Sequence, residues 1–213
     1  MSAGKKTKTV FSKAERSHPL KMLVYFVLAG ISMLFFTLMT LFAFSGPERH
    51  LGGQKFPKYF LVSTVIILLS SFFLESARRA FREENGKKLL DRMMITMVLA
   101  LAFSVAQVMG WMQLWDSGIT LYGIGGIPPT TGTPSGAFLF LISGLHLLHL
   151  SVGLVFLFLT MFKVVHTRSD DVRSVIFFTN RLERTRIDML TLYWHFLGGL
   201  WLILFLYFLW FFV

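Results

Sequence analysis

Five apolar runs, each long enough to cross a bilayer as a helix, constrain the fold of this chain more than any other feature. A crossing takes about 20 helical residues. The runs cover residues 22–44, 56–74, 93–115, 136–162 and 189–213. With 54% hydrophobic and only 15% charged residues, the chain is predicted to be an all-α membrane protein, a bundle of five transmembrane helices. The first run is too long for the apolar region of a signal peptide, so we expect a retained helix.

The basic residues alternate between the segments that separate these runs. Eighteen of the 21 Lys and Arg residues lie before the first run, between the second and third, or between the fourth and fifth. Because basic loops stay on the cytoplasmic side, we expect a cytoplasmic N-terminus and a periplasmic C-terminus. We divide the chain into a basic N-terminal segment, 1–21, and a transmembrane domain, 22–213. The segment after the third run, rich in Gly, Pro and Thr, is expected to be irregular.

Several chemistries are excluded by composition. The chain has no cysteine, which excludes disulfides, thiolate metal sites, iron–sulfur clusters and cysteine-linked haem. The net charge of +10 is explained by membrane topology, so no nucleic-acid partner is expected. The sequence also shows no nucleophile beside a base, no phosphate-binding Gly-rich loop and no paired carboxylates inside a run.

Three histidines lie inside the last two runs: His146, His149 and His195. At about 1.5 Å per residue, His149 and His195 lie at similar depths in the bilayer. We expect them to be buried between the fourth and fifth helices as neutral, hydrogen-bonded imidazoles. Haem ligation by this pair is the alternative, whereas a metal site lacks an evident third ligand.

Charged residues flank two of the runs. Glu75 lies three and four residues before Arg78 and Arg79, so an ion pair is available on one helix face. The sequence leaves open whether this pair only snorkels to the headgroups or contacts an anionic lipid or a partner subunit.

Glu183 and Asp188 precede the last apolar run. They are expected to cap this helix and to pair with Arg184 or Arg186.

Small residues in the third and fifth runs predict close helix contacts. Ala102, Ala106 and Gly110 form a small-residue ridge, beside which Gln107 is placed to hydrogen-bond across helices. Gly198 and Gly199 predict a similar notch in the last helix.

Two stretches together are similar to the last two helices of the cytochrome c oxidase subunit III family, which includes subunit III of bacterial quinol oxidases. They are "SGLHLLHLSVGLVFL" and "YWHFLGGLWLILFLYFLWFFV". The resemblance extends over about residues 20–213 and indicates the short, five-helix bacterial form. It carries the pattern residues Gly144, His146, His149, Tyr193, Trp194, His195, Phe196 and Trp201. The sequence departs from the family pattern at Lys58, where the family often has a buried acid, and at Leu197 and Gly198, where it commonly has Val-Asp. Asp188 stands where the family usually has Glu, which is a conservative change.

The resemblance implies a multi-pass subunit of the bacterial inner membrane with no redox centre of its own. Haem and copper would lie in partner subunits. The chain would pack mainly on oxidase subunit I, also meet subunit II, bind phospholipid and support proton uptake and stability during oxygen reduction. The resemblance also allows membership of a larger respiratory supercomplex. His146, His149, His195, Trp194, Trp201 and Gln107 would be structural interhelical residues, and Glu75, Arg78, Arg79 and Asp188 lipid or subunit contacts.

The predicted function is therefore an accessory, non-catalytic subunit III of a haem–copper terminal oxidase, with cytochrome c oxidase preferred. A quinol oxidase subunit or a homologue associated with nitric oxide reductase is the alternative within the family. A membrane cytochrome b with haem on His149 and His195 is the alternative from another class.

Overall fold

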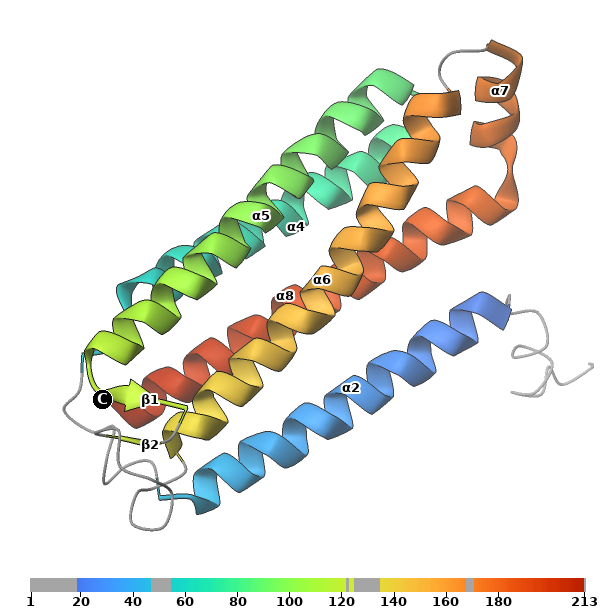
Figure 1. Cartoon of the computed structure of the whole chain (residues 1–213). Helices are drawn as coiled ribbons and strands as arrows, with labels where there is room; N and C mark the ends of the chain where they lie inside the picture. Colours follow the sequence, from blue (N-terminus) through green and yellow to red (C-terminus); the bar gives the residue numbers. More distant parts are fainter. Residues whose placement is uncertain (1–18, 47–54, 122, 125–134, 168–170, 213) are drawn as a thin grey trace, which may run out of the picture.

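The computed structural model describes residues 19–46, 55–121, 123–124, 135–167 and 171–212. Five helices in these residues are long and apolar enough to cross a membrane, as predicted. They are α2 (Pro19–Phe44), α4 (Lys58–Arg82), α5 (Gly86–Asp116), α6 (Ser135–Thr167) and α8 (Arg181–Phe212). The chain is a multi-pass membrane protein with a helical bundle as its core (Figure 1).

Four of the five helices extend well beyond the apolar runs from which they were predicted. The last helix begins at Arg181, eight residues before its apolar run, and α4 continues to Arg82. Long charged side chains at helix ends reach the headgroup region, so these turns can remain helical at the membrane surface. Residues 1–18, most of the predicted basic segment, lie outside the described part.

Two elements were not predicted. A nine-residue helix, α7 (Asp171–Thr179), lies between α6 and α8. Two short strands, β1 (Ile119–Thr120) and β2 (Gly123–Ile124), form an antiparallel pair in the segment expected to be irregular. We call the end of the bundle beside α7 the α7 end; there α4 and α6 finish and α5 and α8 begin (Figure 1).

The helices α4 and α5 form the closest pair in the bundle, and their sequence explains why. A short turn joins them, and the Asn85 side chain caps α5 by accepting a hydrogen bond from the Lys88 amide at 3.0 Å. Near the other end, Gly110 faces the Phe60 ring so closely that a Cβ there would lie 2.3 Å from a ring carbon. The small-residue ridge predicted in α5 therefore does admit a neighbouring helix.

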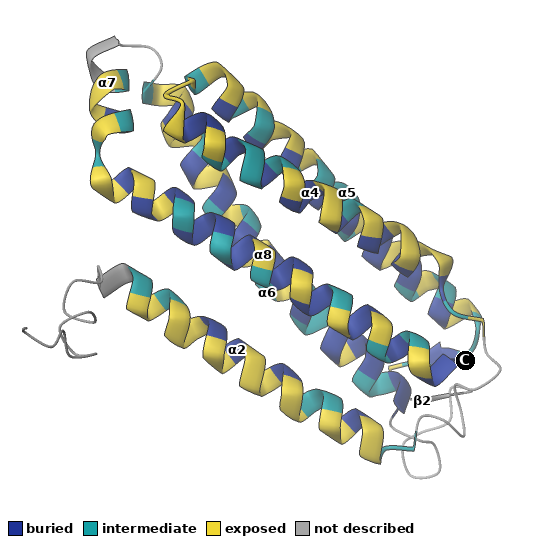
Figure 2. Cartoon of the chain, turned by 180° about the vertical axis from the view of Figure 1, so that it is seen from behind, coloured by how far each residue is buried: buried dark blue, intermediate teal, exposed yellow. Residues whose placement is uncertain are grey.

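The last helix, α8, packs against both α4 and α6, whereas α2 packs mainly on α6 and α8. Gly198 faces Ser71 and Ile67 of α4, but Gly199 is exposed, so only half of the predicted notch is used. Figure 2 shows α2 largely exposed and the inner faces of α4, α6 and α8 buried.

Candidate functional site

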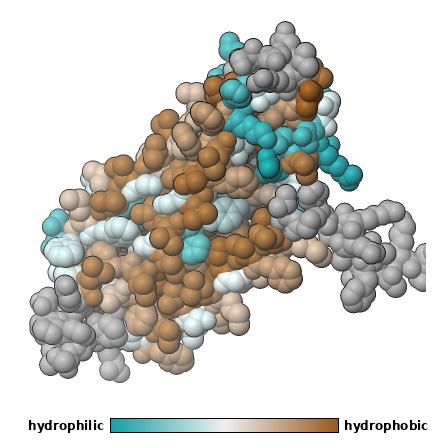
Figure 3. Space-filling model, turned by 45° about the vertical axis from the view of Figure 1, so that its right-hand side comes forward, coloured by the Kyte–Doolittle hydropathy of each residue, from teal (hydrophilic) through white to brown (hydrophobic). Residues whose placement is uncertain are grey.

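Charged side chains gather at the α7 end in two clusters, each containing an acid from α8. Figure 3 shows hydrophilic residues concentrated at this end, while apolar residues cover most of the remaining surface in view. One cluster connects α8 to α4 and the other connects α8 to α6. Both are positioned by the first turns of α8, which precede its apolar run.

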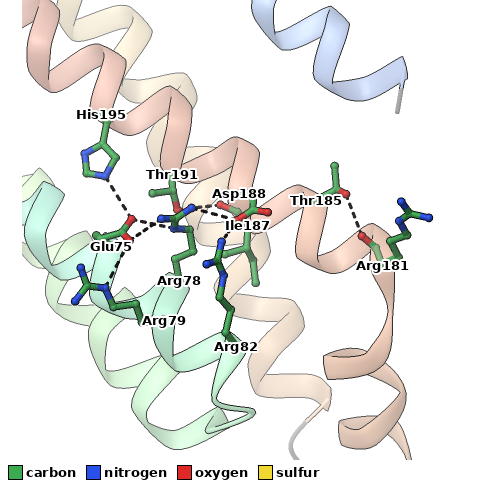
Figure 4. Close-up of polar contacts among 10 residues, drawn as sticks. All are labelled: Glu75, Arg78, Arg79, Arg82, Arg181, Thr185, Ile187, Asp188, Thr191 and His195. Atoms are coloured by element: carbon green, nitrogen blue, oxygen red, sulfur yellow. Dashed lines mark hydrogen bonds and ion pairs between the residues drawn. The ribbon is translucent and has the colours of Figure 1, made fainter. Parts of the chain in front are cut away.

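The first cluster is built around Glu75 and Asp188. The Arg78 guanidinium donates two hydrogen bonds to the Glu75 carboxylate, at 2.7 and 2.9 Å. Asp188 lies 3.6 Å from Arg78 and 3.5 Å from Arg82, so these contacts join α8 to α4 (Figure 4). Arg79 adds a longer contact to Glu75, at 3.6 Å.

The predicted Glu75–Arg78 pair is confirmed. The expected pairing of Asp188 with Arg184 or Arg186 is wrong, because Asp188 faces α4 instead. The charged side chains of this cluster keep 23–73% of their surface exposed. At such exposure each ion pair contributes at most about 1 kcal/mol, so the cluster orients α4 and α8 more than it stabilises them.

The second cluster is more deeply placed. Glu183 is 5% exposed and accepts hydrogen bonds from Lys163 of α6, at 2.5 Å, and from Arg186, at 3.0 Å. The pairing with Arg186 was predicted, whereas the Lys163 contact was not. These groups line a cavity of about 300 Å³ between α6 and α8, together with Phe156, Leu159 and Thr160. A buried carboxylate needs such partners because an unpaired charge there would be costly.

Two tryptophans attach α8 to α4 inside the bundle. Trp194 and Trp201 are fully buried, and their indole N–H groups donate to Ser70 and Thr64, each at 3.0 Å. Both were predicted as interhelical residues, and the structure places them in that role. Two hydroxyls on the apolar helix α4 thus supply the acceptors that buried indoles require.

Gln107 forms the corresponding contact between α5 and α4. Its side-chain amide donates to the Ser63 hydroxyl at 2.9 Å, as expected of an interhelical residue. Ser63 in turn donates to the Phe60 carbonyl on its own helix.

His195 is not buried between α6 and α8, so that prediction is wrong. Its side chain is 45% exposed and points toward Glu75 of α4, with 3.7 Å between Nε2 and the carboxylate (Figure 4). The depth argument ignored rotation about the helix axis. One residue, or 100°, separates His195 from the fully buried Trp194, and this turns the imidazole out of the core toward the exposed side of the α4–α8 contact.

His149 is interhelical, as predicted, but its ring lies 5.7 Å from that of Phe35 of α2 and forms no hydrogen bond or ring contact with the described residues of α8, so the expected link to α8 through its imidazole is wrong. It is only half-buried, and its Nδ1 atom lies 2.7 Å from the Leu145 carbonyl on its own helix. The link between α6 and α8 comes instead from Tyr193, whose hydroxyl donates to the His149 backbone carbonyl at 2.9 Å. Tyr193 was noted as a residue of the family pattern, but this hydrogen bond was not predicted, because a backbone acceptor leaves no signal in the sequence.

His146 is the deeply buried histidine. It is 0% exposed, and neither ring nitrogen has a hydrogen-bond partner among the described residues. Its ring lies 5.2 Å from that of Trp201 and also contacts Phe35 and Phe103. It therefore acts as a packing residue at the meeting point of α2, α5, α6 and α8. Ser143, Leu150 and Gly153, buried at helical spacing around it, mark this face in the sequence.

Within the described ranges, no group of three or more His, Asp or Glu side chains could hold a metal ion. The family to which the chain is similar is decided by sequence comparison. The sequence model of "Cytochrome c oxidase subunit III" matches residues 20–213. The chain belongs to this family. The subunit III family is a non-catalytic one among the subunits of haem–copper oxidases.

The chain is similar to relatives named as subunits of quinol oxidases and to a relative named as a subunit of cytochrome c oxidase. A "Probable quinol oxidase subunit 3" from Staphylococcus epidermidis is 27% identical over 81% of this chain and 77% of its own length. A "Cytochrome c oxidase subunit 3" from Tachyglossus aculeatus aculeatus is 26% identical over 86% of this chain and 67% of its own length. At these identities the two names do not separate the electron donors.

Proposed function

We propose that this chain is an accessory, non-catalytic subunit III of a haem–copper terminal oxidase, preferably a cytochrome c oxidase. The match to the subunit III family over nearly the whole chain carries the proposal. The site supports it, because the buried side chains of Gln107, Trp194 and Trp201 join helices to one another. Haem and copper would then belong to partner subunits I and II.

A quinol oxidase is the second candidate, favoured by the staphylococcal relative. Subunit III of both oxidase types belongs to one family, so the electron donor has to be identified from the partner subunits. A copper-binding subunit II in the same complex would favour cytochrome c.

A membrane cytochrome b is less well supported by the geometry. Its two ligands would be His149 and His195, but His195 points toward Glu75 on α4 and His149 contacts its own helix. Two facing imidazoles with a flat space between them are what bis-histidine haem ligation requires.

The proposed location is the bacterial inner membrane, with the α7 end in the cytoplasm. Segments 1–21, 78–92 and 163–186 carry most of the basic residues, which supports this orientation and the division into a basic segment, 1–21, and a transmembrane domain, 22–213. Reporter fusions after Lys13 and at Gly132 test it. A cytoplasmic signal at Lys13 and a periplasmic one at Gly132 are expected, and the reverse result would refute the orientation.

At the same end we propose a contact with anionic lipid through Arg79. Its side chain is 73% exposed, whereas Arg78 is held by Glu75 and Asp188. Clusters of cations beside a cytoplasmic leaflet attract anionic headgroups. Arg79→Gln should lower the anionic lipid retained by the purified complex, and unchanged retention would remove this contact.

The direct test of the accessory role is purification of the tagged chain in mild detergent. We expect it to co-purify with a haem-containing subunit I. Recovery of the chain without such a partner, yet with a haem spectrum of its own, would favour the cytochrome b alternative.

A further inference from the structure

A cavity between α5 and α6 lies at the other end of the bundle, away from both charged clusters. Its volume is about 580 Å³, and its lining includes Trp111, Met112, Trp115, Asp116, Leu121 and Phe140. Volumes of this size are typical of small-molecule sites, which are mostly apolar with few polar groups. Among the described residues of the lining, Asp116 is the charged one.

One wall of this cavity, formed by Trp111 and Phe140, is held in place by contacts between α5 and α6. The Trp111 indole donates to the Ser143 hydroxyl of α6 at 2.9 Å. Its ring lies 6.4 Å from that of Phe140, which is 9% exposed. One aromatic wall is therefore held by contacts with α6, while Trp115 is 54% exposed at the open side.

Asp116 is poorly matched to its own helix. It is the last residue of α5, where the helix dipole disfavours an anion. The side chain is exposed and forms no ion pair with any described residue. A carboxylate, the negative end of a helix and two tryptophan faces all favour the same ligand charge, a cation.

Apolar residues extend this site along the helix into the membrane. Val108, Trp111, Met112 and Trp115 follow the i, i+3, i+4, i+7 spacing of one helix face. From Asp116 to Val108 this face runs about 12 Å, enough for part of an acyl chain. The cavity thus combines a cation-attracting rim with an apolar floor.

We propose that this cavity binds a phospholipid with a primary ammonium headgroup, phosphatidylethanolamine. The ammonium would donate to Asp116 beside the Trp115 ring, and an acyl chain would lie along the α5 face. A choline headgroup has no N–H to donate, so it would bind more weakly. The proposal does not depend on the oxidase role, because the site lies within this chain.

Native mass spectrometry of the purified full-length protein, with any co-purifying subunits, tests the site. Phosphatidylethanolamine, phosphatidylcholine and phosphatidylglycerol with identical acyl chains are added in turn. We expect phosphatidylethanolamine to be retained best and Asp116→Asn to lower its retention about tenfold. Because Asp116 is exposed and unpaired in the described chain, this variant should fold normally.

Asp91→Asn is the matched control, since it removes an exposed acid from the opposite end of α5. Trp115→Ala should lower retention, whereas Trp210→Ala, an exposed tryptophan of α8, should not. Equal retention of the three lipids, or an Asp116→Asn variant that binds like the wild type, would overturn the proposal. So would displacement of the lipid by a short-chain quinol, which would assign the cavity to an aromatic amphiphile.

Discussion

The helices α2 and α8 differ more in their contacts than in their apolar character. In the most apolar 18-residue window of each helix, 50% of the residues of α8 are buried but only 17% of those of α2. Yet α2 is the more hydropathic of the two. In a bilayer, lipid tails are as apolar as leucine, so hydropathy inserts a helix without deciding what it packs against.

The difference lies in a few polar and aromatic groups. α8 carries Trp194, Trp201 and Tyr193, which donate to acceptors on α4 and α6. In α2, the hydroxyls of Ser32, Thr37 and Thr40 donate to carbonyls of the same helix. Among the described residues, the Tyr207 hydroxyl donates to the Met39 carbonyl of α2 at 2.6 Å, and Ser135 of α6 contacts Ser45, directly after α2, at 3.1 Å. We infer that α4, α5, α6 and α8 form the stable core and that α2 is attached to it.

The largest loss of stability is expected from a substitution inside this core. Trp201→Ala removes the bond to Thr64 and the ring contacts with Phe60, Phe103 and His146. We expect a loss of about 3–5 kcal/mol of unfolding free energy, measured by denaturation in detergent. Trp210→Ala, at a position 77% exposed on the same helix, should cost far less. Equal losses for the two variants would contradict the comparison.

A smaller loss of stability is expected from a substitution where two helices approach most closely. Gly110→Ala places a methyl group against Phe60 and should cost about 1–3 kcal/mol through overpacking. Gly30→Ala in α2 meets nothing within 4 Å and should stabilise by about 0.5–1 kcal/mol, because alanine favours a helix. Thermal unfolding of both purified variants checks the pair. The same sign for both would show that α2 is packed as tightly as the core.

A substitution of His146 tests whether packing alone explains the contact between α2 and the core. His146→Phe keeps an aromatic ring beside Phe35 and removes two buried nitrogens that lack described partners. Since an unsatisfied buried polar group costs about 1–3 kcal/mol, the variant should be no less stable than the wild type. The midpoint of thermal unfolding reports this. A clear fall in that midpoint would mean that the imidazole has a polar role that packing does not explain.

The smallest effect is expected at the exposed end of the α4–α8 contact. Glu75→Gln weakens the links to Arg78 and His195 and should cost at most about 1 kcal/mol. Added salt should narrow the difference from the wild type, because exposed charges are screened. Denaturation at low and high ionic strength measures it. A large loss that salt leaves unchanged would show that this cluster is buried in the assembled complex.

The sequence predicted the five spans because apolar run length is a direct physical requirement of crossing a bilayer. It also predicted an interhelical role for Gln107, whose amide demands a partner. The interhelical role of Trp194 and Trp201 followed from the resemblance to the family. It did not predict α7, because nine residues of mixed polarity at a membrane surface lack the long apolar run on which the prediction relied.

The errors at the histidines have a common physical cause. Depth along a helix was estimated, but the direction in which each side chain points was not. For His195 that direction places the ring toward Glu75, and for His146 it places the ring in the aromatic core. Lys163 was missed for a related reason, since its contact with Glu183 depends on how α6 and α8 meet after the intervening α7.

The most direct test of the accessory role compares the oxidase complex with and without this chain. Haem content per subunit I and the initial rate of oxygen consumption are measured, followed by the decay of activity during sustained turnover. We expect unchanged haem content, a retained initial rate and a faster decay of activity without the chain. Loss of a haem from a complex whose subunit I remains assembled would contradict it.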